Sequence, residues 1–67
     1  MAKMTKAEMA QFIRDEQQEV ADEHVRLGWT GEWHKFATDA HNLTLADIAE
    51  EEGHADLAQP LRRAIGD

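Results

Sequence analysis

Hydrophobic residues recur at helical spacing near the start of the chain. The stripe consists of Met9, Ile13, Val20 and Leu27, with Phe12 and His24 on its flanks. Thr5 and Glu8 have the S/T-x-x-E spacing of a capping box, and Gly28 is a residue type that ends helices. This pattern predicts a helix over about 5–27 whose stripe faces the core.

A second stripe follows, at spacings of four, three, four and three. It consists of Trp29, Trp33, Phe36, Ala40 and Leu43. The spacing predicts a helix over about 31–41 whose aromatic side chains pack into the core. Asn42 can adopt the left-handed conformation that ends a helix, and Thr44 can cap the next one. We therefore expect a separate third helix over about 45–52, which Gly53 stops.

A fourth helix is expected over about 55–65. Proline inside a helix removes one hydrogen bond and clashes with the preceding turn, so Pro60 predicts a kink or break near Gln59. No strand-like alternation of polar and apolar residues is present. The prediction is therefore all-α: residues 1–67 form a single acidic domain, a small bundle of about four helices.

Residues 44–61 resemble one helix pair of an ankyrin repeat. The matching residues are Thr44, Ile48, Ala49, Gly53, His54, Asp56, Leu57 and Leu61. The resemblance implies an antiparallel helical hairpin with a tight turn at Gly53-His54. Leu45 stands where the pattern has proline, and Pro60 also departs from it. Repeats of this kind need about three stacked copies to be stable, so the chain length excludes an ankyrin array.

The residue types exclude several kinds of chemistry. Cysteine and serine are absent from all 67 residues, no Gly-rich phosphate loop is present, and the four histidines lack metal-ligand spacing. We expect no enzyme activity, cofactor or metal. The absence of cysteine suits a reducing cytoplasm. The start, MAKMTKAEMAQF, lacks the apolar region of a secretory signal, and no membrane span is expected.

Negative charge is concentrated in the middle of the chain. Residues 8–56 hold thirteen acidic residues against three basic ones, which gives −10 within a total of −7. Direct binding to nucleic acid needs a basic surface, and the acids and Pro60 also count against a helix-turn-helix at residues 44–61. A protein partner with a basic surface is expected instead.

The candidate partner-binding residues form three groups. They are the carboxylates Glu8, Asp15, Glu19 and Asp22 on one face of the first helix, the trio Glu50, Glu51 and Glu52 at the end of the third, and Trp29. The trio faces the negative end of a helix dipole with no evident local partner, which is typical of a binding feature. Trp29 is the tryptophan expected to be exposed. The alternative interpretation is a solvated surface over an aromatic core.

Two classes of function follow. The first is a stoichiometric inhibitor or modulator of a basic, nucleic-acid-binding protein; phage and mobile-element inhibitors, such as anti-restriction and anti-CRISPR proteins and acidic DNA mimics, are similar in general character. The second is a structural or regulatory helical module, for example a homodimeric transcription-associated factor. The sequence leaves both open.

Overall fold

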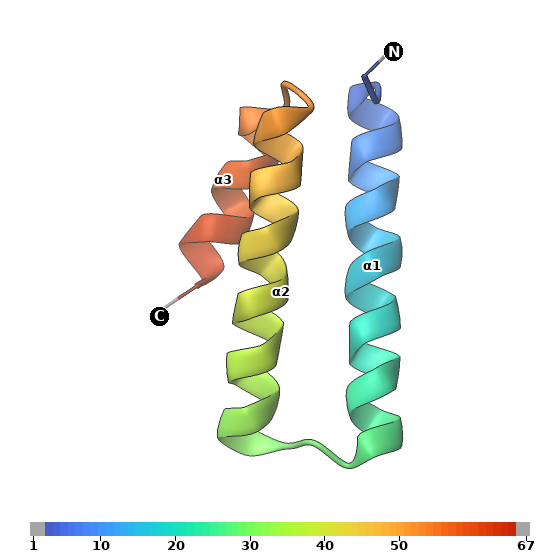
Figure 1. The fold of residues 1–67 in the computed structure, drawn as a ribbon, viewed down its shortest axis with the longest axis vertical. Helices are drawn as coiled ribbons and strands as arrows, with labels where there is room; N and C mark the ends of the chain where they lie inside the picture. Colours follow the sequence, from blue (N-terminus) through green and yellow to red (C-terminus); the bar gives the residue numbers. More distant parts are fainter. Residues whose placement is uncertain (1–2, 66–67) are drawn as a thin grey trace.

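The computed structural model describes residues 3–65, and all of their regular structure is helical (Figure 1). Helix α1 (Lys6–Leu27) and helix α2 (Gly31–Glu51) run antiparallel as a long hairpin. Helix α3 (Ala55–Ala64) packs mainly against α2, beside the half of the hairpin that lies far from the α1–α2 turn. The all-α prediction is confirmed, with three helices in place of about four.

Helix α1 begins and ends where the sequence predicts. The Thr5 hydroxyl accepts a hydrogen bond from the backbone N–H of Glu8 at 3.1 Å, and the Glu8 carboxylate accepts one from the backbone N–H of Thr5 at 2.9 Å. This reciprocal pair is the predicted capping box. Gly28 ends the helix with φ of 72°, a left-handed conformation that glycine adopts without steric cost.

Helix α2 is one continuous element, so the predicted end at Asn42 is wrong. Asn42 is buried inside the helix, and its side-chain oxygen accepts a hydrogen bond from Gln17 of α1 at 3.1 Å. Thr44 is not a cap, because its hydroxyl donates to the carbonyl of Ala40 one turn earlier at 3.2 Å. Both polar side chains are therefore satisfied within a helix, and neither opens the backbone.

The core lies in the half of the molecule where three helices meet. It consists of Met9, Ile13, Leu45, Ala46, Ala49, Ala58 and Leu61. Three of these residues are alanines, which lets α2 and α3 approach closely. The predicted α1 stripe is only partly buried: Met9 and Ile13 lie in the core, whereas Leu27 is exposed. Leu27 follows the same helical face, but it lies beyond the reach of the third helix.

Helix α3 continues through Pro60 to Ala64, so the predicted break does not occur. Pro60 is exposed at the helix surface. The backbone carbonyl that loses its hydrogen bond to a proline can then be hydrated, which lowers the cost of keeping the helix intact. Ala58 and Leu61, on either side of Pro60, bury their side chains against α2 and hold the helix in place.

Polar contacts tie the start of the chain to the α2–α3 turn. The backbone N–H of Met4 donates to the Glu52 carboxylate at 2.7 Å, and His54 Nε2 donates to the carbonyl of Met4 at 2.7 Å. Lys6 forms an ion pair with Asp56. These contacts close the packed end of the molecule.

This closed end is expected to make stability depend on pH. Hydrogen bonds from Thr5 lower the pKa of Glu8 below its ordinary value of 4.5, and the hydrogen bond from Lys6 lowers the pKa of Asp56 below 3.8. A carboxyl whose pKa is lower in the folded state stabilises the fold above its unfolded-state pKa and loses that contribution as the pH falls through the folded-state value. We expect the melting temperature to fall on acidification from about pH 5 to pH 3.

Circular dichroism melts at several pH values check this dependence. The double variant Glu8→Gln with Asp56→Asn should show a shallower decline than the parent. The control is Glu19→Gln, which removes an exposed carboxylate that forms no ion pair among residues 3–65. A double variant with the same pH profile as the parent would contradict the assignment.

Within residues 3–65, no helix has both the length and the apolar character needed to cross a membrane.

Candidate interaction surface

The large aromatic side chains lie on the surface, which corrects the prediction that they form the core. Trp29 is 45% exposed, Trp33 is 73% exposed and Phe36 is 69% exposed. The inward face of α2 carries Asn42, Leu45, Ala46 and Ala49 instead. Helix α3 ends at Ala64 and covers only the far half of α2. Trp29 is exposed, as expected, but the choice of Trp29 over Trp33 as the exposed tryptophan is wrong, because Trp33 is more exposed.

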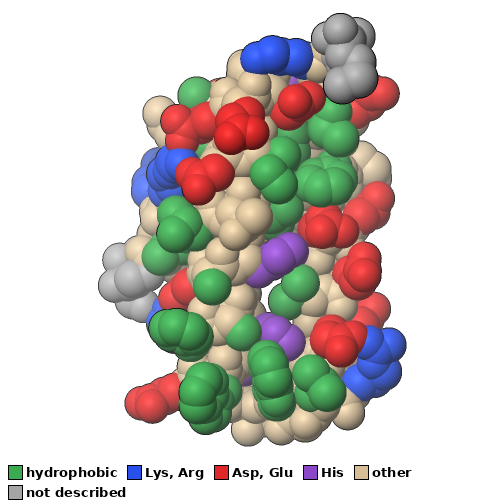
Figure 2. All heavy atoms as spheres, in the orientation of Figure 1, with side chains coloured by type: hydrophobic (Ala, Val, Ile, Leu, Met, Phe, Trp, Pro, Cys, Tyr) green, Lys and Arg blue, Asp and Glu red, His purple; other side chains and the backbone are tan. Residues whose placement is uncertain are grey.

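We call the exposed residues of this face the aromatic stripe. It consists of Trp29, Trp33, Phe36, Ala40 and Leu43. The rings of Trp33 and Phe36 meet edge to face with centroids 6.4 Å apart. Trp29 and Trp33 line one shallow hollow, and Trp33 and Phe36 line the next. Figure 2 shows hydrophobic side chains gathered at the end of the molecule around the α1–α2 turn.

The stripe is large for a protein of this size. Because an aromatic side chain presents about 150–250 Å², the exposed fractions of Trp29, Trp33 and Phe36 leave roughly 400 Å² of aromatic surface in water. The largest apolar patch of a typical monomer is about 300–600 Å², and such patches are often functional. The total accessible surface of this molecule is only 4869 Å². The stripe is therefore the candidate contact site on α2.

Polar side chains join the two helices beside this end. The Nδ1 atoms of His24 and His34 lie 2.8 Å apart, so the N–H of one ring donates a hydrogen bond to the ring nitrogen of the other. The ring of His24 also lies 5.3 Å from the ring of Trp29. His41 lies 3.8 Å from Glu16. A cavity of about 150 Å³ separates the helices here, and an opening between them is visible in Figure 2.

The four carboxylates predicted on one face of α1 form what we call the acidic edge. The residues are Glu8, Asp15, Glu19 and Asp22. Glu8 belongs to the capping box, Asp15 accepts a hydrogen bond from Gln11, and Asp22 accepts one from Gln18. None of the ion pairs within residues 3–65 involves any of the four. Acidic side chains follow the outer border of α1 in Figure 2.

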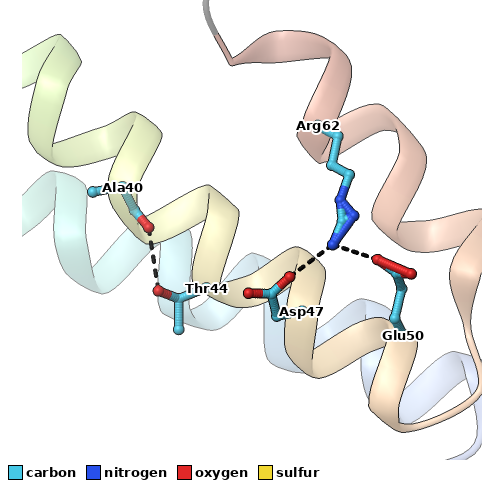
Figure 3. Close-up of polar contacts among 5 residues, drawn as sticks. All are labelled: Ala40, Thr44, Asp47, Glu50 and Arg62. Atoms are coloured by element: carbon cyan, nitrogen blue, oxygen red, sulfur yellow. Dashed lines mark hydrogen bonds and ion pairs between the residues drawn. The ribbon is translucent and has the colours of Figure 1, made fainter.

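The trio at the end of α2 does have local partners. Glu50 and Asp47 both pair with Arg62 of α3 (Figure 3). Glu52 accepts the hydrogen bond from Met4. The interpretation that these carboxylates oppose folding without a local gain is therefore wrong for Glu50 and Glu52. The side chain of Glu51 is exposed, whereas its backbone carbonyl accepts a hydrogen bond from Lys3.

Metal-ligating side chains do not converge in the described part of the chain, where no group of three or more His, Cys, Asp or Glu residues could hold an ion. His24 and His34 form a pair with no third ligand. The two features that stand out are therefore surfaces: the aromatic stripe on α2 and the acidic edge on α1.

Comparison with known proteins adds no family. No protein-family model matches the chain, and neither a curated protein nor a solved structure is significantly similar to it. The resemblance of residues 44–61 to an ankyrin helix pair therefore stays a prediction, and the function has to be argued from the two surfaces.

Proposed function

We propose that this protein acts by binding another protein that carries a basic surface, and that it blocks the surface through which that partner binds nucleic acid. The observation that carries the proposal is the acidic edge, a single row of carboxylates that no Lys or Arg pairs with in residues 3–65. Four cations, Lys6, Arg26, Lys35 and Arg62, pair with acids outside the edge, so the edge keeps its negative charge.

The dimensions of the edge suit a basic groove. Glu8 and Asp22 are fourteen residues apart, which is about 20 Å along a helix at 1.5 Å per residue. One strand of duplex DNA carries a phosphate about every 3.4 Å, so the edge is sparser than a nucleic-acid strand. Long-range attraction can steer the encounter, and apolar contacts would have to add to the affinity.

Charge reversal on the edge tests this function. The partner is captured with the tagged protein and identified, and its affinity for purified variants is then measured. Glu19→Lys and Asp15→Lys should each weaken binding roughly tenfold or more, because a cation then faces a basic surface. The control is Gln59→Lys, which introduces a lysine at an exposed position on α3, outside both surfaces.

Two further measurements complete the test. Binding by the parent should weaken as salt is raised, because salt screens exposed charges. One equivalent of the protein should release nucleic acid from the partner. The proposal fails if both edge variants bind as tightly as the parent and the partner keeps its nucleic acid.

A structural or regulatory homodimeric module is the second candidate. The observation that favours it is the aromatic stripe. Four of its five residues lie on α2, where they form an exposed apolar surface separate from the acidic edge on α1, and a second copy could cover that surface.

A further inference from the structure

The end of the molecule near the α1–α2 turn is only one helix deep. The described residues span 38 × 23 × 15 Å, and a single helix with its side chains is already about 10–12 Å thick. Helix α3 lies beside α2 only at the other end, on the side away from α1 (Figure 1). The far half of α2 is therefore covered by α3, whereas the half that carries the aromatic stripe has no third helix beside it and faces solvent.

The spacing of the stripe suits a second copy of the same helix. Its residues are separated by four, three, four and three positions, a pattern that reads three, four, three and four in reverse. In a two-fold pair of antiparallel helices the same patch meets itself, and facing residues have numbers whose sum is nearly constant. If the axis passes beside Phe36, Trp33 faces Ala40 of the second copy. Trp29 precedes the first residue of α2 and packs beside His24, so it borders this interface from the α1–α2 turn. Phe36 then meets Phe36 of the second copy at the axis, and on either side of it the large Trp33 lies opposite the small Ala40, as close packing requires.

We propose that the aromatic stripe is the interface of a homodimer in which α2 packs antiparallel against α2 of a second copy, with the two-fold axis beside Phe36.

Charges beside the stripe complement one another in this register. Lys35 and Asp39 lie one turn apart on α2 and pair with each other at 3.0 Å. In an antiparallel pair centred beside Phe36, residues at equal distances on either side of the axis face each other. Lys35 and Asp39 lie almost symmetrically about that axis, since their numbers sum to 74 against 72 or 73 for the facing pairs of the stripe. Lys35 of one copy therefore lies opposite Asp39 of the other. The acidic edge lies on α1, which contacts the face of α2 that carries His34 and Asn42 and not the stripe. The interface therefore does not bring the two acidic edges together.

The available area is of the size that a dimer needs. A specific interface buries about 800 Å² on each partner. The three rings supply about half of it by the estimate from aromatic surface area, and Leu43, Ala40 and the flanking side chains contribute to the remainder. A membrane surface fits less well, because Glu32 and Asp39 border the stripe and the chain has a net charge of −7.

Sedimentation equilibrium of the full chain tests the dimer. The parent should sediment with twice the monomer mass, and its apparent mass should fall on dilution, as expected for a reversible dimer. The variant Trp33→Ala with Phe36→Ala should raise the dimer dissociation constant by about 30-fold or more, the effect expected of central aromatic residues. Val25→Ala is the matched control, because Val25 is 80% exposed on α1 and outside the stripe. It should dimerise like the parent.

A charge swap between two chains tests the register. Lys35→Glu and Asp39→Lys should each weaken the homodimer, because like charges then face each other across the axis. An equal mixture of the two variants should recover the dimer. In the mixed pair the introduced glutamate of one chain faces the introduced lysine of the other, and the unchanged Asp39 of the first chain faces the unchanged Lys35 of the second. Repair of the contact within a chain cannot explain recovery on mixing.

Three outcomes would overturn the proposal. They are a parent that is monomeric at high concentration, a stripe variant that dimerises like the parent, and a mixture no tighter than its two components. Binding of a monomeric parent to zwitterionic phosphatidylcholine vesicles would identify a lipid surface as the occupant and would equally exclude the dimer. The edge variant Glu19→Lys should dimerise normally, so failure of the proposed function and failure of the dimer are distinguishable.

Discussion

Replacing Leu45 with alanine is expected to cost about 2–5 kcal/mol of unfolding free energy, the range observed when a buried leucine is truncated. Leu45 is 1% exposed and is one of the two largest fully buried side chains in the described part of the chain. A domain of this length has a total stability of roughly 3–10 kcal/mol at about 0.05–0.15 kcal/mol per residue. The variant should therefore lose a large share of its stability and unfold at a clearly lower urea concentration than the parent.

Urea denaturation followed by circular dichroism measures this loss. Leu43→Ala is the matched control, because it is the same substitution two residues away at a side chain that is 48% exposed. It should cost less than about 1 kcal/mol in the monomer, since little apolar area returns to water. Equal losses for the two variants would mean that α2 turns a different face toward the core.

Enlarging Ala49 should disrupt the other side of the core. Ala49 is completely buried in the cluster that joins α2 to α3. Ala49→Leu adds three carbon atoms where the two helices approach closely, and overpacking of this kind costs about 1–3 kcal/mol. Since α3 is only ten residues long, we expect it to separate from α2 before the hairpin unfolds.

Limited proteolysis with mass spectrometry detects that separation. Ala49→Leu should be cleaved within α3, after Arg62 or Arg63, faster than the parent. Ala7→Leu is the control, because it makes the same change at an exposed position on α1. Equal cleavage rates for Ala49→Leu and the parent would show that the site has room for the larger side chain.

Local signals were enough to predict parts of the fold. Thr5, Glu8 and Gly28 set the two ends of α1 through contacts that span only a few residues, and Gly53 marks the turn after α2. The helix end predicted at Asn42 was wrong because an asparagine side chain can either end a helix or lie inside one and hydrogen-bond to a neighbouring helix. Its partner, Gln17, is 25 residues away and becomes a neighbour only after the hairpin forms.

The wrong prediction of a helix end at Asn42 also led to the wrong prediction that the aromatic side chains form the core. Phe36 and Leu45 are nine residues apart, which is about two and a half turns of a continuous helix, so they lie on opposite faces. With a break at Asn42, both could face inward. In the single helix α2 only one can, and Leu45 is the one that lies in the buried cluster. Treating residues 31–51 as one continuous helix would have predicted from the sequence that the aromatic stripe and Leu45 lie on opposite faces.

The candidate surfaces were predictable to different degrees. The acidic edge depends only on the periodicity of α1, so the sequence was sufficient to group its carboxylates. The partners of Glu50 and Glu52 come from α3 and from the start of the chain, and the order of residues along the chain does not reveal such contacts.

The exposed stripe also determines which optical signals report on this protein. Both of its tryptophans, Trp29 and Trp33, lie near the α1–α2 turn, away from the buried cluster. Trp33 is already largely hydrated in the folded monomer and Trp29 is nearly half exposed, so intrinsic fluorescence should change less than the circular dichroism signal when the core melts. A melt recorded by emission would then report only weakly a transition that circular dichroism detects. A blue shift in emission would mark the moment when something covers the stripe.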